Sequence, residues 1–218
     1  MIEGIETTVD RDAVVVTARE PLAVLSSAFV RGGFAAARTI VNLHVPKNLR
    51  QEHSDDLLPD FVDRRGLPGP WVGLLTAAWT ERAELAEARD HGVAALAIVT
   101  VGLSNRIAAG TTPIGVWAPS TINVIVVVDG APDPAALVNA VMTVTEVKTS
   151  LLAAADLRCA DGHVASGTST DAIVVAATGR GPRQRFGGPI SDLGWVVARA
   201  SRTALGAGIR RWMEEEHP

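Results

Sequence analysis

The stretch TINVIVVV, residues 121–128, decides what kind of fold the chain adopts. It is short and almost wholly apolar, which is typical of a strand that is buried on both faces in the middle of a sheet. Residues 133–155 follow with the periodicity of a helix, and Asp133 and Pro134 suit its N-cap and first turn. We therefore expect a central strand, followed by a helix, in a sheet that is covered by helices.

Other segments of strand length are spread along the chain. They are rich in β-branched residues and most are bounded by Gly, Pro, Asn or Asp; they span residues 13–18, 39–45, 71–77, 94–101 and 172–178. Two more helices are predicted, one over 81–92 with Gly92 as its C-terminal cap and one that begins at Ser191. Because strands and helices do not alternate regularly, we predict the α+β class, with a single domain over residues 1–218 and a mixed, largely antiparallel sheet.

One long segment lacks a strand or helix pattern. Residues 46–70 are polar and proline-rich, which predicts a long surface loop that can include a helical turn. Loops of this length are uncommon in compact domains unless they act as lids or binding loops.

The composition indicates a soluble globular protein. Of the 218 residues, 47% are hydrophobic and 20% are charged, and the net charge of −4 argues against a nucleic-acid partner. The apolar runs are far shorter than the roughly 20 residues of a membrane helix, so no membrane partner is expected. Acidic residues near the N-terminus stand where a secretory signal needs basic ones, and a single Cys159 cannot form an intrachain disulfide. These features predict a cytoplasmic location and leave a homo-oligomer open.

The stretch VASGTSTDAIVVAATGRG, residues 164–181, places a dense polar cluster in front of a predicted strand. Four hydroxyls, those of Ser166, Thr168, Ser169 and Thr170, precede one carboxylate, Asp171. Two interpretations are open: a turn with good capping chemistry, or the edge of an active site.

The helix predicted over 133–155 carries a lysine in the middle of its apolar face. Lys148 must snorkel, pair with a carboxylate or lose its charge there. It is either part of a structural ion pair or a functional lysine that faces Asp171. Glu146 lies on the opposite face by the same periodicity, so both can serve one site only if both faces are covered.

Asn42 and His44 form a second polar pair, in VNLHVPKN. Alternation along a strand points both side chains to the same side, where they are either ligand contacts or satisfied polar groups at a strand end. The histidines show neither HExxH nor His-x-His spacing, so no metal site is predicted.

Seven segments in chain order carry a family resemblance. They are LSSAFVRGGFAAARTIVNLHVPKN (25–48), VGLLTAA (72–78), VTVGLSNRIAAG (99–110), TINVIVVVDG (121–130), VTEVKTSLL (144–152), ASGTSTDAIVVAATGRG (165–181) and GGPISDLGWVVARA (187–200). Together they resemble the adenosylcobinamide amidohydrolase family of corrinoid salvage. The similarity covers essentially the whole chain.

The resemblance implies a specific reaction. The amide that joins the aminopropanol arm to the corrin ring of adenosylcobinamide would be hydrolysed, and the product, adenosylcobyric acid, would re-enter coenzyme B12 synthesis. No cofactor is expected, because cobalt enters only as part of the corrinoid substrate. Two alternatives are a non-catalytic corrinoid-binding or carrier protein and an amidohydrolase that acts on a different amide. Attack by a covalent nucleophile and attack by water are both left open.

The resemblance also suggests roles for the polar residues. The catalytic candidates are Asp171 as base, Lys148 as donor or orienting group, Thr168 and Glu146. The candidates for substrate binding are Asn42, His44, Ser104, Asn105, Ser169 and Thr170, although alternation along the strand points Thr170 away from Asp171. Stacking surface for the substrate is expected from Trp71, Trp79 or Trp117.

Overall fold

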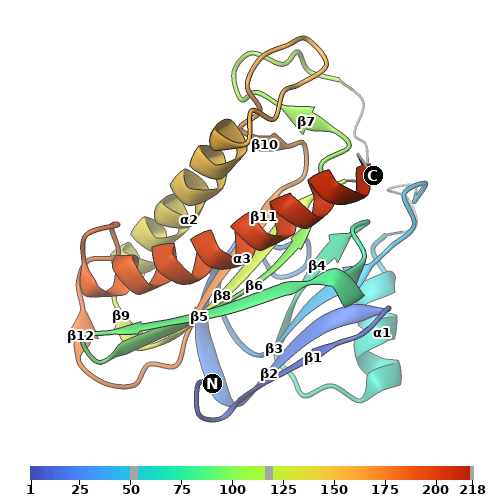
Figure 1. Ribbon diagram of the computed structural model, residues 1–218. Coiled ribbons are helices and arrows are strands. Elements are labelled where there is room, and N and C mark those ends of the chain that lie inside the picture. The colour runs from blue at the N-terminus through green and yellow to red at the C-terminus, as the bar shows by residue number, and fades with distance from the viewer. Residues whose placement is uncertain (50–53, 116–119, 217–218) are drawn as a thin grey trace.

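The strand with the two-sided apolar pattern lies inside an eight-stranded sheet (Figure 1). The computed structural model describes residues 1–49, 54–115 and 120–216. In it β8 (Ile122–Asp129) pairs in parallel with β11 (Ala172–Ala177) and antiparallel with β6 (Val93–Val101). The prediction for this stretch is confirmed.

The sheet is mixed and largely antiparallel, and with the helices it gives the predicted α+β class. Its strand order is β4-β3-β2-β11-β8-β6-β5, with β1 on β2. Five of the seven pairings are antiparallel, and β3–β4 and β11–β8 are parallel. The other strands of the sheet are β1 (Ile5–Val9), β2 (Ala13–Ser26), β3 (Gly33–His44), β4 (Trp71–Thr76) and β5 (Glu84–Asp90). Short two-residue strands form the pairs β7 (Arg106–Ile107) with β10 (Gly167–Thr168) and β9 (Ala131–Pro132) with β12 (Arg183–Gln184).

The sheet folds back on itself along β2. The first part of β2, Val14–Ala18, pairs with β1, whereas Ala23–Ser26 pairs with β11. Between these parts the register with β3 shifts, around Pro21, and such an irregularity bends a strand. We call β1–β4 the first half-sheet and β11, β8, β6 and β5 the second half-sheet. Their inner faces share one apolar cluster, to which Val14, Val16, Ile40, Ile98, Ile125 and Val127 belong.

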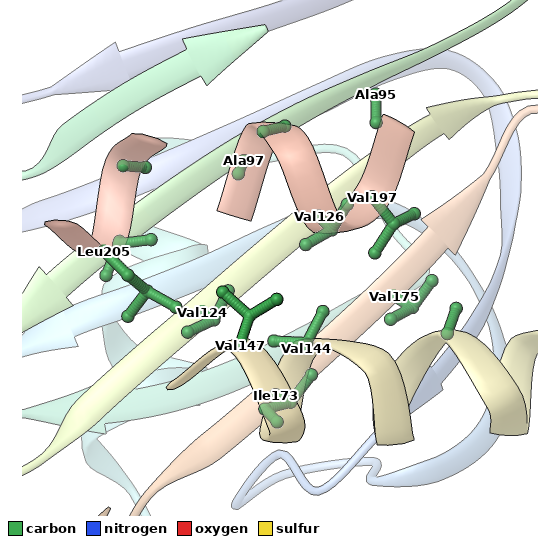
Figure 2. Close-up of a cluster of buried hydrophobic side chains, with 14 of the residues drawn as sticks. Ala95, Ala97, Val124, Val126, Val144, Val147, Ile173, Val175, Val197 and Leu205 are labelled. Atoms are coloured by element: carbon green, nitrogen blue, oxygen red, sulfur yellow. The ribbon is translucent and has the colours of Figure 1, made fainter. Parts of the chain in front are cut away.

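Helices cover the outer faces of both half-sheets, which gives four layers. Helices α2 (Pro134–Ala154) and α3 (Asp192–Glu216) lie on the second half-sheet (Figure 1). In Figure 2, Val144 and Val147 of α2 gather with Val124 of β8 and Ile173 of β11. Helix α1 (Leu57–Arg65) covers the first half-sheet through side chains such as Leu58. Val124 and Ile125 face different clusters, as strand alternation requires.

Helix α2 is long and apolar enough, by length and composition alone, to span a membrane. Its buried residues, among them Leu137 and Val144, pack in the core with the second half-sheet. The apolar character of α2 is explained by this packing.

One predicted element is wrong, and another holds more helix than predicted. The helix predicted over 81–92 is a three-residue 3-10 turn, Thr80–Arg82, followed by β5, whose burial alternates along the strand as it pairs with β6. Pairing outweighs the helix propensity of its Glu, Ala and Arg residues. The loop predicted over 46–70 contains α1, held by burial of Leu58, Phe61 and Val62; residues 50–53 of that loop lie outside the described part of the chain.

Candidate active site

A cavity of about 180 Å³ opens between the two half-sheets at one end of their strands. We call it the inter-sheet cavity. It is lined by residues at the ends of β2, β3 and β4 and at the starts of β8 and β11, and its hydroxyl groups come from Ser27, Ser54, Thr76, Ser120, Thr121 and Thr170. Thr170 therefore lies in the wall of the inter-sheet cavity, although alternation along the strand pointed its side chain away from Asp171.

A buried polar network lies beside this cavity and connects the two half-sheets. The Asn42 amide on β3 donates to Thr100 Oγ1 on β6 at 3.0 Å, and Asn123 on β8 donates to Asn42 Oδ1 at 2.8 Å. Asn123 also donates to the Leu75 carbonyl of β4 at 2.9 Å. Asn42 and Asn123 are at most 2% exposed, so these bonds are shielded from water.

Thr121 joins this network to the cavity wall. Its hydroxyl lies 3.1 Å from Asn123 Oδ1 and 2.7 Å from the Thr170 carbonyl oxygen. The Thr170 hydroxyl in turn donates to the Ser120 carbonyl at 3.2 Å. The hydroxyls of Thr121 and Thr170, just before β8 and β11, are thus fixed by bonds to backbone carbonyls of each other's segment, and that of Thr121 also by Asn123.

Lys148 and Asp171 form a buried ion pair, so the lysine does face Asp171 as one interpretation of the sequence had it. The Lys148 side chain is 9% exposed and that of Asp171 is 12% exposed. Gly167 packs directly on both groups: a Cβ there would lie 2.6 Å from Lys148 Nζ. A charge at this depth needs a partner, and each of the two supplies one.

The Asp171 carboxylate is already saturated with donors. Besides Lys148, it accepts from the Thr168 hydroxyl, from the Thr168 N–H at 3.1 Å and from the Ile122 N–H at 3.0 Å. A carboxylate has about four acceptor positions, so proton transfer to Asp171 would break a bond that it makes now. The same bonds tie the turn at 168–170 to the start of β8. Asp171 and Lys148 are thus placed to position the cavity wall.

A second, larger cavity adjoins the first, and we call it the tryptophan cavity. It has a volume of about 470 Å³ and shares Ala77 and Ser120 with the inter-sheet cavity. Trp79 and Trp212 line it, together with the polar side chains of Lys47, Arg82, Ser104, Arg211 and Glu215. Trp79 stacks on His44 with ring centroids 4.8 Å apart.

The remaining predicted site residues are placed in different ways. Glu146 is exposed on α2, on the face away from Lys148, and the structure does not bring it to the ion pair. Ser104 lines the tryptophan cavity, and its N–H donates to Ser120 Oγ at 3.0 Å. Asn105 donates to Ser169 Oγ at 2.7 Å, at the exposed rim of the 168–170 turn. His44 lies beside the tryptophan cavity through its stacking on Trp79.

Of the three tryptophans expected to offer stacking surface, only Trp79 lines either of these two cavities among the described residues. Trp71 packs instead under the Arg31 guanidinium, 4.8 Å from its ring centroid. Trp117 lies outside the described residues.

The sequence reasoning missed several cavity residues. Ser27, Thr76 and Thr121 stand singly beside strand ends, without a motif, and meet only when the two half-sheets pack. Asn123 offered a usable signal, because it is the one amide inside the apolar run 121–128. A polar side chain in a strand buried on both faces needs partners, and Asn123 finds them in Asn42 and Leu75.

Metal ligands are not gathered in the part of the chain that the structure describes. No group of three or more His, Cys, Asp or Glu side chains comes together among residues 1–49, 54–115 and 120–216. The expectation that the enzyme holds no metal or cofactor stays a prediction.

Comparison with known proteins identifies the chain in agreement with the resemblance. It is an enzyme of the amidohydrolase class. Residues 1–217 match the sequence model of adenosylcobinamide amidohydrolase, and the chain belongs to that family.

Two relatives carry the same name. The adenosylcobinamide amidohydrolase of Methanosarcina mazei is 27% identical over 193 residues, which cover 83% of this chain and 86% of the relative. That of Halobacterium salinarum is 30% identical over 192 residues, covering 82% and 76%. Among solved structures, a β-aminopeptidase from Burkholderia sp. aligns with a TM-score of 0.46 and 14% identity, over 96% of this chain and 79% of that one.

Proposed function

We propose that this protein hydrolyses the amide between the aminopropanol arm and the corrin ring of adenosylcobinamide, and releases adenosylcobyric acid for reuse in coenzyme B12 synthesis. The observation that carries the proposal is the family match over residues 1–217. Two adjoining cavities of different size and chemistry support it. The small one suits a short amide arm, and the larger one suits a flat part of the rest of the corrinoid.

The inter-sheet cavity offers what amide hydrolysis needs most, which is donors fixed beside the reacting carbonyl. We assign the contacts with the reacting amide to the hydroxyls of Ser27, Ser120 and Thr170. Ser27 Oγ accepts from the Ile173 N–H at 3.0 Å, and Ser120 Oγ accepts from the Ser104 N–H at 3.0 Å. In both cases this bond uses an oxygen lone pair, so the hydroxyl proton can point to the carbonyl oxygen of the substrate. Attack by a serine oxygen and attack by water both fit this arrangement.

The Lys148–Asp171 ion pair does not contact the reacting amide; it positions the residues that do. Asp171 holds the N–H of Ile122 and the turn that carries Thr170, and Lys148 balances its charge. We therefore assign Asp171 and Lys148 as positioning residues, in place of the base and donor that the resemblance suggested. The free, buried Cys159 supports a cytoplasmic location, where thiols stay reduced.

Incubation with adenosylcobinamide should give adenosylcobyric acid and free aminopropanol in equal amounts, as measured by mass spectrometry. A corrin absorbance change without either product would contradict turnover and favour a corrinoid carrier. Hydrolysis of other amides, with adenosylcobinamide left intact, would favour an amidohydrolase of different specificity.

Removal of metal should leave the rate unchanged. We expect the same turnover before and after dialysis against a chelator, because the described residues gather no set of ligands. The check is the initial rate with adenosylcobinamide, with metal content measured on the same samples. A loss of rate that zinc or another divalent ion restores would contradict this expectation.

A further inference from the structure

Trp79 is an exposed aromatic ring that is nevertheless held in a fixed orientation. Its side chain is 53% exposed, and its indole stacks on the His44 imidazole at an interplanar angle of 18°. His44 Nδ1 lies 3.0 Å from the Ala78 carbonyl oxygen, which can only accept, so Nδ1 carries the proton and donates. One face of the indole is thus covered, and the exposed area lies on its other face and edge.

The surroundings of Trp79 suit a flat ligand with polar groups at its edge. The tryptophan cavity of about 470 Å³ has a second indole, Trp212, in its wall, and Arg106 lies over that ring at 5.3 Å from its centroid. Two arginines of the wall are already paired, Arg82 with Glu215 and Arg211 with Glu84. Their charges are balanced inside the protein, so they offer hydrogen bonds at the edge of a ring and little net attraction for an anion.

We propose that the open face of Trp79 stacks on the adenine ring of the adenosyl group and makes Trp79 the residue that selects adenosylated corrinoids. This inference rests on the proposed function. The shared border of the two cavities, at Ala77 and Ser120, lets one substrate reach both: its amide arm enters the inter-sheet cavity while its adenosyl group lies in the tryptophan cavity. Stacking of a nucleobase on an aromatic side chain is strong enough to discriminate corrinoids that carry the adenosyl group from those that do not.

The test is the dissociation constant of two corrinoids, followed by the corrin absorbance so that turnover is not needed. Adenosylcobinamide is compared with cyanocobinamide, which has cyanide in place of the adenosyl group. Trp79→Ala should weaken binding of adenosylcobinamide by about 5- to 140-fold, the fold-change that corresponds to roughly 1–3 kcal/mol for one stacked base. Binding of cyanocobinamide should change less than about threefold. Trp79→Phe should keep most of the preference for the adenosyl form.

Trp195→Ala is the matched control, because Trp195 is 47% exposed and lines a separate cavity on α3. It should leave both constants unchanged. Equal weakening of both corrinoids by Trp79→Ala would overturn the inference and point to a contact with the corrin ring, and no weakening of either would also overturn it. The proposed function fails separately, if the unmodified enzyme forms no adenosylcobyric acid from adenosylcobinamide.

Discussion

Lys148→Met should unfold the protein at a temperature about 6–20 °C lower than that of the unmodified chain. The substitution leaves the Asp171 charge, 12% exposed, without its cation, and loss of one partner of a buried pair costs about 3–5 kcal/mol. In a domain of this size each kcal/mol shifts the midpoint by about 2–4 °C. Thermal unfolding followed by circular dichroism measures the shift, and turnover should fall with it because the 168–170 turn loses its anchor.

The double variant Lys148→Met, Asp171→Asn tests whether the lost stability comes from the unpaired Asp171 charge or from the changed side-chain shape. Removal of both charges should recover a large part of the lost stability, since a buried ion pair replaced as a whole is far less harmful than one that is broken. Glu146→Gln is the control on the same helix, and because Glu146 is exposed it should stay within about 0.5 kcal/mol of the unmodified protein. If Lys148→Met melts like the unmodified chain and turns over substrate normally, the anchoring role is wrong.

Asn123→Leu should lower kcat by roughly 100-fold while the protein still folds. The change removes the donors to Asn42 Oδ1 and to the Leu75 carbonyl, and it leaves Thr121 without one of its partners. Unsatisfied buried groups cost about 1–3 kcal/mol, and a shift of about 1 Å in a positioned group can cost about 100-fold in rate. The measurements are kcat and KM with adenosylcobinamide, beside a denaturant titration.

A second substitution distinguishes positioning from stability. Asn42→Leu with Asn123→Leu replaces both amides by apolar groups, which can be nearly neutral for stability, so the double variant should be less destabilised than the two single effects added together. Its kcat should stay low, because Thr121 still lacks its amide partner. Recovery of kcat together with stability would show that the network is purely structural.

Much of the fold follows from short-range patterns. The run 121–128 is a central strand and 133–155 is a helix, because burial on two faces and capping at Asp133 are local signals. A helix was predicted over 81–92 because Gly92 suits the end of a helix as well as it suits a tight turn. With His91 at a φ of 46° and Gly92 at 77°, it forms the turn between β5 and β6. Leu85, Glu87 and Arg89 are all exposed on one face of β5, and because one of them is apolar the sequence shows no clean strand alternation there.

The candidate site could be predicted only in part. A lysine on an apolar helix face must snorkel, pair with a carboxylate or lose its charge, and a position facing Asp171 was one of the interpretations; the structure shows that the two side chains form an ion pair. That Asp171 accepts from Ile122 as well depends on β8 and β11 lying side by side, a contact between segments about 50 residues apart in sequence. No local sequence pattern predicts this contact between β8 and β11. The catalytic parts suggested for Thr168 and Glu146 stay untested.

The position of β11 between β2 and β8 has a consequence for folding during synthesis. The second part of β2, Ala23–Ser26, has β11 as its neighbour on one side, and β11 also completes the edge of β8. While the ribosome is still adding the residues before Ala172, both of these edges are without their final partner and open to other chains. The nascent protein is therefore most vulnerable to aggregation late in synthesis, and chaperones would be needed most at that stage.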